Sequence, residues 1–131
     1  MKLKLAEIVE SVDGIKELSA LKLPAKTAYQ IARNMKLVNV ELDEFNKARS
    51  SLITDKYGVR SEDGDSFQVP PENVEKFTKE MTDLLNMEIN LDIYPVELAD
   101  EVLLSADTMY RISWMFVNYN QEEKKGIIIN D

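Results

Sequence analysis

One uninterrupted apolar stripe, spaced alternately by three and four residues, constrains the fold of this 131-residue chain more than any other feature. That alternation is typical of a long α-helix with one apolar face along its whole length. It predicts a helix from Pro24 to about Asp55, ending near Gly58, with Pro24 in the first turn. The stripe comprises Ala28, Ile31, Met35, Val38, Leu42, Phe45, Arg49 and Leu52.

The predicted helix is long for a domain of this size. It would measure roughly 45 Å, whereas the radius of gyration of such a domain is about 14 Å. We therefore expect it to protrude, or to pair with something outside its own core. A partner chain is the simplest cover, so a homo-oligomer is predicted, with an interface formed by Ile31, Met35, Val38, Leu42, Phe45 and Arg49.

Arg49 stands on this stripe where an aliphatic residue is expected. A buried arginine needs a carboxylate or phosphate partner, and in a helix pair it would specify the register. The alternative is that Arg49 reaches solvent at the end of the stripe. The sequence leaves both interpretations open.

Shorter elements surround the long helix. Apolar spacing predicts an amphipathic helix from Leu3 to Leu21, which Gly14 weakens slightly. An Asp63-Gly64 pair between two short runs predicts a β-hairpin within residues 57–70.

Three further elements follow the two prolines at 70 and 71. The pattern predicts a helix over residues 72–86 and a half-buried strand over 87–93. Ser105 is a suitable N-cap for a last helix that runs to about Val117. That helix is apolar on most sides and is expected in the core through Met109, Ile112, Trp114, Phe116 and Val117.

Together these elements predict an α+β fold that is mainly α. A helical hairpin with one long arm would pack on a small antiparallel sheet and two further helices. The length and the 44% apolar content fit a single domain over residues 1–117. Residues 118–131 are expected to form a polar linker and an isoleucine-rich tail, in which 127–129 could add a strand to a sheet edge.

Composition excludes much chemistry. The chain has no cysteine and no histidine, so it has no thiol nucleophile, no Ser-His-Asp triad and few ligands for a transition metal. The acids around Asp63 and Gly64 resemble a calcium loop, but the twelfth position is Val74 rather than glutamate. We therefore expect no metal, no cofactor and no enzymatic activity, although carboxylate catalysis stays an alternative.

The net charge of −8 disfavours nucleic acid and anionic membranes as partners. No segment is long and apolar enough to span a membrane, and the N-terminus has no apolar signal core. The expected location is therefore the cytoplasm.

Basic residues are nevertheless concentrated at the start of the long helix, where residues 22–36 contain no acid. Lysine and arginine there would add to the anion-binding tendency of a helix N-terminus, and Tyr29 could stack on a base. A phosphate-bearing small ligand is one interpretation, and pairing with the acidic region 70–107 is the other. The residues concerned are Lys22, Lys26, Tyr29, Gln30, Arg33 and Lys36.

A second candidate group lies in the last helix. Arg111 follows Asp107 by one turn and precedes Trp114 by about one turn. An ion pair with ring packing is the simpler interpretation. The alternative is a pocket in which Tyr110, Arg111 and Trp114 surround an anion.

Several short motifs resemble a family of small proteins of unknown function encoded by phages and prophages of Gram-positive bacteria. The resemblance covers roughly residues 1–115 and carries no established catalytic or binding residues. It implies a phage accessory protein that acts in the host cytoplasm. The motifs are Leu23-Pro24-x-Lys26-x-x-Tyr29-x-x-Ala32-Arg33-Asn34, Lys56-Tyr57-Gly58, Asp63-Gly64, and Leu84-Leu85 followed by Glu88-Ile89.

Three classes of function remain open at this stage. The first is stoichiometric binding that counters a host defence system, by sequestering a nucleotide signal or by capping a defence protein. The second is a chaperone for virion or tail assembly that binds a structural protein. The third is an enzyme that depends on carboxylates.

Overall fold

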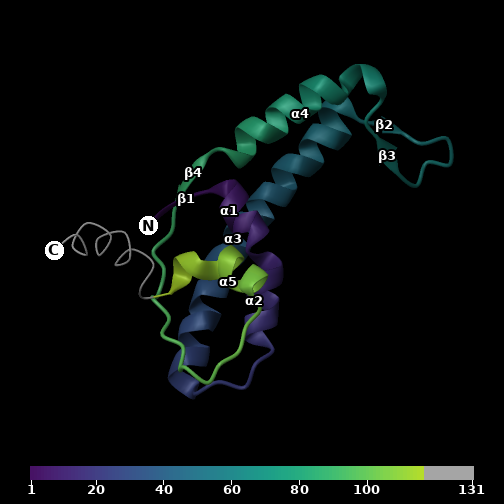
Figure 1. The fold of residues 1–131 in the computed structure, drawn as a ribbon. Coiled ribbons are helices and arrows are strands. Elements are labelled where there is room, and N and C mark those ends of the chain that lie inside the picture. Colours follow the sequence, from purple (N-terminus) through teal and green to yellow (C-terminus); the bar gives the residue numbers. More distant parts are fainter. Residues whose placement is uncertain (117–131) are drawn as a thin grey trace.

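Helix α3 (Ala25–Ser51) is the longest element of the computed structural model, which describes residues 1–116 (Figure 1). A π-helical turn, η1 (Leu52–Tyr57), extends it to Gly58, so the predicted long helix and its end are confirmed. Glycine is needed at 58 because a Cβ there would overlap the Ile53 carbonyl, which accepts the Gly58 N–H at 2.7 Å. Pro24 is the N-cap and not, as predicted, a residue of the first turn.

The N-terminal helices pack along the first half of α3 and complete a helical hairpin. They are α1 (Leu5–Glu10) and α2 (Val12–Ser19), so the prediction of one helix from Leu3 to Leu21 was wrong at its ends and at Ser11. Ser11 is fully buried, and its hydroxyl donates to the Ile8 carbonyl at 2.7 Å. A serine that bonds to the preceding turn in this way competes with the helical hydrogen bonds.

Two short antiparallel pairs of strands occur in the described part of the chain. Strand β1 (Lys2–Lys4) pairs with β4 (Glu88–Asn90), which places Leu3 opposite Ile89. The predicted strand after residue 86 is thus confirmed, although it is shorter than expected. The predicted hairpin is also confirmed: β2 (Val59–Arg60) pairs with β3 (Phe67–Gln68), and Gly64 adopts a φ of 76° in the turn.

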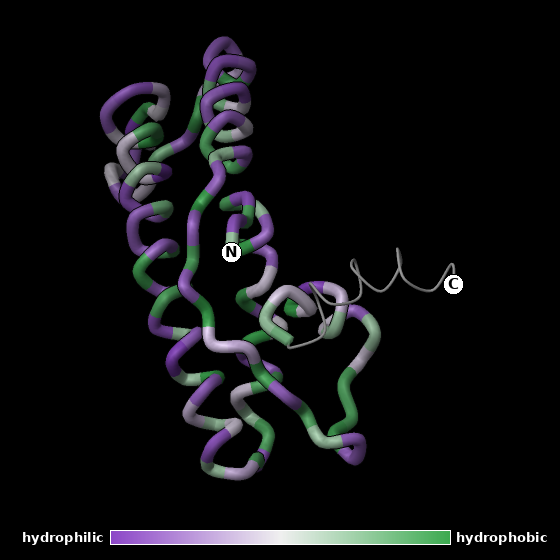
Figure 2. The backbone as a smooth tube through the Cα atoms, turned by 90° about the vertical axis from the view of Figure 1, so that its left-hand side faces the viewer, coloured by the Kyte–Doolittle hydropathy of each residue, from purple (hydrophilic) through white to green (hydrophobic). Residues whose placement is uncertain are grey.

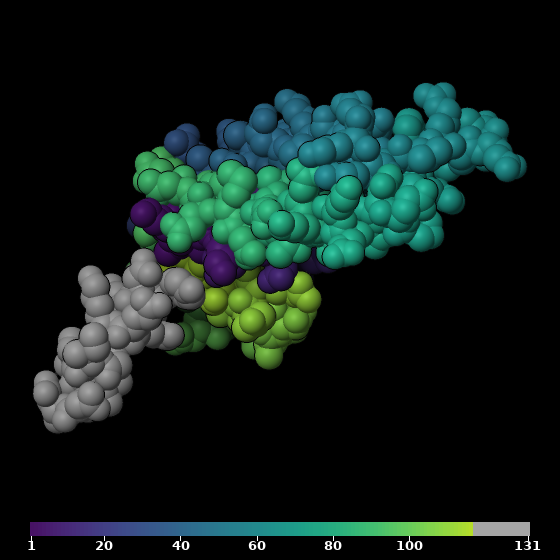
Figure 3. All heavy atoms as spheres, turned by 90° about the horizontal axis from the view of Figure 1, so that it is seen from above, coloured from purple at the N-terminus to yellow at the C-terminus, as the bar shows by residue number. Residues whose placement is uncertain are grey.

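Helix α4 (Pro71–Leu85) returns beside the C-terminal part of α3 and forms an arm with it (Figures 1 and 3). The β2–β3 hairpin lies at the far end of this arm. Tyr57 and Phe77 meet edge to face at 6.4 Å between η1 and α4. The long helix therefore protrudes as predicted. Helix α4 of the same chain packs beside it, a role that we had assigned to a partner chain.

The segment after β4 crosses α3 without regular structure and leads into α5 (Ala106–Ile112) and a 3-10 turn, η2 (Ser113–Met115). The last helix is therefore shorter than predicted, and Met109, at 38% exposed, is not in the core. Val117 and the predicted tail lie outside the described residues. Figure 2 shows apolar and polar residues alternating along α3. The main buried cluster comprises Leu3, Ile8, Ile15, Leu18, Ile31, Val38, Leu91, Val96, Ile112, Trp114 and Met115.

Candidate functional site

The predicted basic residues lie on one exposed side of α3, adjacent to its buried stripe. Spacings of three and four residues place them within about a third of the helix circumference, and Lys22 lies just before the helix. Tyr29 is 60% exposed although its ring is apolar. We call this surface the basic face; it comprises Lys22, Lys26, Tyr29, Gln30, Arg33 and Lys36.

Tyr94, from the segment that crosses α3, orients one residue of the basic face. The Arg33 guanidinium lies 4.9 Å from the centre of the Tyr94 ring, and its Nη2 donates to the Tyr94 hydroxyl at 2.9 Å. The buried neighbour Asn34 fixes the backbone of Tyr94 through two hydrogen bonds. Arg33 is thus held at the surface while its other N–H groups remain available to an anion.

The basic face is not neutralised by carboxylates of the described chain. Within residues 1–116, ion pairs join Lys47 to Glu44, Lys56 to Glu80 and Arg111 to Asp107. None involves the basic face, and the segment that crosses α3 presents a tyrosine ring to Arg33 rather than a carboxylate. Pairing with region 70–107 therefore does not occur within the described part of one chain.

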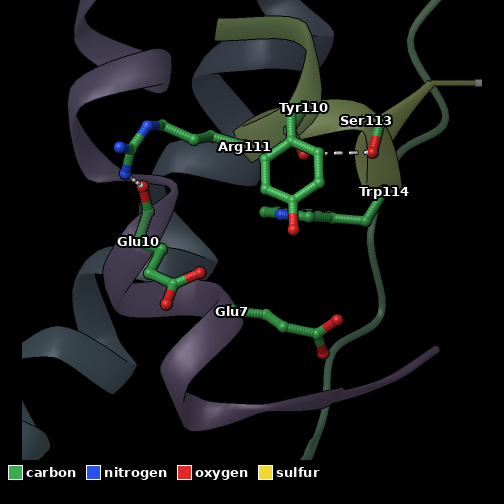
Figure 4. Close-up of a pocket in the computed structure, with 6 residues that line it drawn as sticks. All are labelled: Glu7, Glu10, Tyr110, Arg111, Ser113 and Trp114. Carbon is green, nitrogen blue, oxygen red and sulfur yellow. Dashed lines mark hydrogen bonds between the residues drawn. The ribbon is translucent and has the colours of Figure 1, made fainter. Parts of the chain in front are cut away.

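The second predicted group, Tyr110, Arg111 and Trp114, lines a cavity of about 290 Å³ beside α1 (Figure 4). The predicted ion pair is present as well, with Arg111 Nε 3.0 Å from Asp107 Oδ2. This hydrogen bond raises the pKa of Arg111 above its ordinary value. The ion pair of the simpler interpretation and a cavity beside the same residues are therefore both present.

Three contacts fix the position of helix α5, which carries Tyr110 and Arg111. The Ser105 hydroxyl caps the helix by accepting the Thr108 N–H at 3.1 Å, as predicted. The Thr108 hydroxyl donates to the carboxylate of Glu17 on α2. Gly14 allows the two helices to approach closely, since a Cβ there would lie 2.6 Å from Ile112 Cγ2.

Two glutamates that the sequence analysis missed change the chemistry of the cavity. Glu7 and Glu10 extend from α1 toward the side of Tyr110 and Trp114, as Figure 4 shows. Their spacing of three residues indicates only that they share one face of the first helix. The packing of that helix against α5 depends on contacts between residues distant in sequence. With two carboxylates in its lining, this cavity is a poor site for the anion of the alternative interpretation.

The predicted interface stripe is largely internal. Ile31, Val38 and Phe45 are buried, and Met35 and Leu42 are half-buried. Arg49 is exposed, so the alternative in which its side chain reaches solvent is the one found in the structure.

A polar cluster in the arm was not predicted. Lys56 Nζ donates to the Glu80 carboxylate at 2.9 Å, and Tyr57 also interacts with this carboxylate. The interactions with Tyr57 and Lys56 lower the pKa of Glu80, and the same carboxylate raises the pKa of both Tyr57 and Lys56. The cluster joins η1 to α4 and supports the arm.

The acids of the hairpin turn have a structural explanation. Asp63 accepts hydrogen bonds from the Ser61 hydroxyl and from the Asp65 N–H, which lower its pKa. Its carboxylate thus closes the turn. Residues 1–116 contain no group of three or more aspartate, glutamate, histidine or cysteine side chains placed to hold a metal ion.

Comparison with protein-family models, curated proteins and solved structures finds no match to this chain. None of the helices described here combines the length and the apolar character needed to cross a membrane.

Proposed function

We propose that this protein is a non-enzymatic, phage-encoded accessory protein that binds a phosphate-bearing small molecule, such as a nucleotide, on the basic face of α3. Binding of this kind would sequester a nucleotide signal of a host defence system. The phage setting rests on the family resemblance of the sequence. The binding chemistry rests on the basic face.

The observation that carries the proposal is that the cations of the basic face have no carboxylate partner within the described chain. A phosphate would supply the missing negative charge, and Arg33 can bind it through two parallel hydrogen bonds. Tyr29 offers an exposed ring on which a base can stack. The cavity beside α1 is the weaker alternative for an anion, because Glu7 and Glu10 line it.

A thermal-shift screen against nucleotides, including cyclic dinucleotides and cyclic ADP-ribose compounds, tests this function. A ligand at 100 times its dissociation constant adds about 2.7 kcal/mol of stability, which raises the melting temperature of a domain of this size by several degrees. We expect one or more of these ligands to give such a shift, and a higher salt concentration to weaken it. If no compound gives a shift, the proposal is wrong.

Arg33→Glu and Arg60→Glu form a matched pair for the same screen. Both arginines are exposed and lie over an aromatic ring, Arg33 over Tyr94 and Arg60 over Phe67 in the hairpin. We expect Arg33→Glu to abolish the ligand-induced shift and Arg60→Glu to leave it unchanged. Equal shifts in both variants would place the ligand away from the basic face.

A role in binding a phage structural protein is the second candidate, and the arm favours it. Helix α4 has an apolar side but no fully buried residue, and Val74 is 46% exposed. Such a side can dock on another protein. Co-purification with a phage tail or capsid protein that Val74→Glu abolishes would favour this candidate over nucleotide binding.

A further inference from the structure

The cavity beside α1 is lined by both aromatic and acidic side chains. Its volume of about 290 Å³ is close to the lower limit for small-molecule sites. Tyr110 and Trp114 contribute aromatic rings, and Glu7 and Glu10 contribute carboxylates from the facing helix (Figure 4).

The one cation in the lining is already engaged. Arg111 Nε bonds to Asp107 at 3.0 Å, and Nη1 donates to the backbone carbonyl of Glu10 at 3.4 Å. The charge of Arg111 is thus balanced by a carboxylate outside the cavity. Arg111 also attracts Glu10 electrostatically, but it forms no ion pair with Glu7 or Glu10.

The negative charge of the glutamates is available to a ligand. Glu7 accepts the Lys4 N–H through one carboxylate oxygen, at 2.8 Å. Neither glutamate forms an ion pair with a lysine or arginine of residues 1–116. A cation that entered the cavity would therefore meet carboxylates without cationic partners.

The two rings add a second and independent preference for a cation. Trp114 is only 4% exposed, so most of its ring is shielded from water. Tyr110 is 80% exposed at the rim, which leaves its ring face open. The faces of tryptophan and tyrosine attract ammonium groups through the ring quadrupole, most strongly where water is excluded.

We propose that this cavity binds an alkylammonium group, with the aromatic rings contacting the alkyl chain and the carboxylates of Glu7 and Glu10 pairing with the charge. The site is separate from the basic face and takes a ligand of opposite charge. A free amine and a lysine side chain both present this group, and the experiment distinguishes the two.

Trp114 is the single tryptophan of the chain, so intrinsic fluorescence reports directly on this cavity. The full-length protein is titrated with putrescine as a free amine and with N-acetyl-lysine methylamide as a lysine side chain, against sodium chloride at equal ionic strength. We expect a saturable change in emission with one or both amines and none with salt. The amine that binds more tightly identifies the source.

Charge-neutral variants locate the binding. Glu10→Gln alone and together with Glu7→Gln should weaken amine binding, the double variant by about tenfold or more. Glu75→Gln, an exposed position on α4, is the matched control and should bind as the unmodified protein does. Glutamine at 7 retains an acceptor for the Lys4 N–H, and circular dichroism verifies that each variant is folded.

Three outcomes would overturn the proposal. The first is no saturable change with either amine. The second is equal affinity in the unmodified protein and in the folded double variant. The third is a saturable change with inorganic phosphate but not with the amines, which would favour the alternative interpretation of these residues as an anion site.

Discussion

The side chain of Asn34 binds the backbone of Tyr94 as a neighbouring strand would. Asn34 Nδ2 donates to the Tyr94 carbonyl at 2.7 Å, and Asn34 Oδ1 accepts the Tyr94 N–H at 2.7 Å. Asn34 is fully buried, so its side of both bonds is shielded from water. They fix an irregular segment on α3 and thereby set the position of the ring on which Arg33 lies.

Replacing Asn34 with leucine should lower the free energy of unfolding by about 2–4 kcal/mol, because both backbone groups of Tyr94 lose their partner. Urea denaturation measures the loss. Asn39→Leu, at an exposed position of the same helix, is the control and should change stability by less than about 0.5 kcal/mol. Similar losses in the two variants would contradict a special role for the Asn34–Tyr94 pair.

Gly14→Ala should destabilise the protein although alanine is the better helix former. The added methyl group would lie 2.6 Å from Ile112 Cγ2, and Ile112 is fully buried and cannot move aside. Overpacking costs about 1–3 kcal/mol, which exceeds the gain of about 1 kcal/mol in helix propensity. In an Ile112→Ala background the same substitution should be markedly less harmful, and a double-mutant cycle of unfolding energies measures the difference.

The polar cluster of the arm predicts a pH dependence. The pKa of Glu80 is lowered in the folded state by its interactions with Tyr57 and Lys56. Its contribution to stability is therefore complete above the unfolded pKa, about 4.3, and is lost as pH falls through the lower folded value. Unfolding of the unmodified protein and of Glu80→Gln, compared from pH 7 to pH 2, should show a stability difference at neutral pH that shrinks in acid. A constant difference, or one that grows in acid, would refute this account, and Glu75→Gln should show neither trend.

Ser105→Ala should remove the cap of α5 and cost about 1 kcal/mol. The hydroxyl accepts the Thr108 N–H and also donates to the Thr108 side chain at 2.9 Å. Chemical denaturation measures the loss, and Ser19→Ala, where the hydroxyl is exposed, is the control. Because α5 carries Tyr110 and Arg111, Trp114 emission should shift in the same variant. An unchanged stability would mean that packing on α2 alone holds this helix.

Local signals in the sequence were sufficient for much of the fold. The stripe of α3, the turn at Gly64 and the cap at Ser105 each act within a few residues, and each was predicted. The pairing of β1 with β4 was not, because Leu3 directly precedes an apolar helical spacing and was assigned to that helix. Which element an apolar residue joins is decided by partners distant in sequence.

The two candidate sites likewise differ in how much of each could be predicted from the sequence. The basic face could be predicted because its residues share one helix and repeat with its period. Its lack of carboxylate partners could not, since that depends on which residue of the crossing segment faces Arg33. Glu7 and Glu10 belong to the cavity only because α1 lies against α5.

The pairing of Leu3 with Ile89 also bears on the order in which the chain assembles. Closing a loop of that length costs on the order of 4 kcal/mol in chain entropy, whereas the arm forms from neighbours in sequence. On the ribosome, β1 emerges early and must wait for β4 before it has a partner. We therefore expect the arm to fold first, and the strand that joins the N-terminal segment to it to form among the last steps.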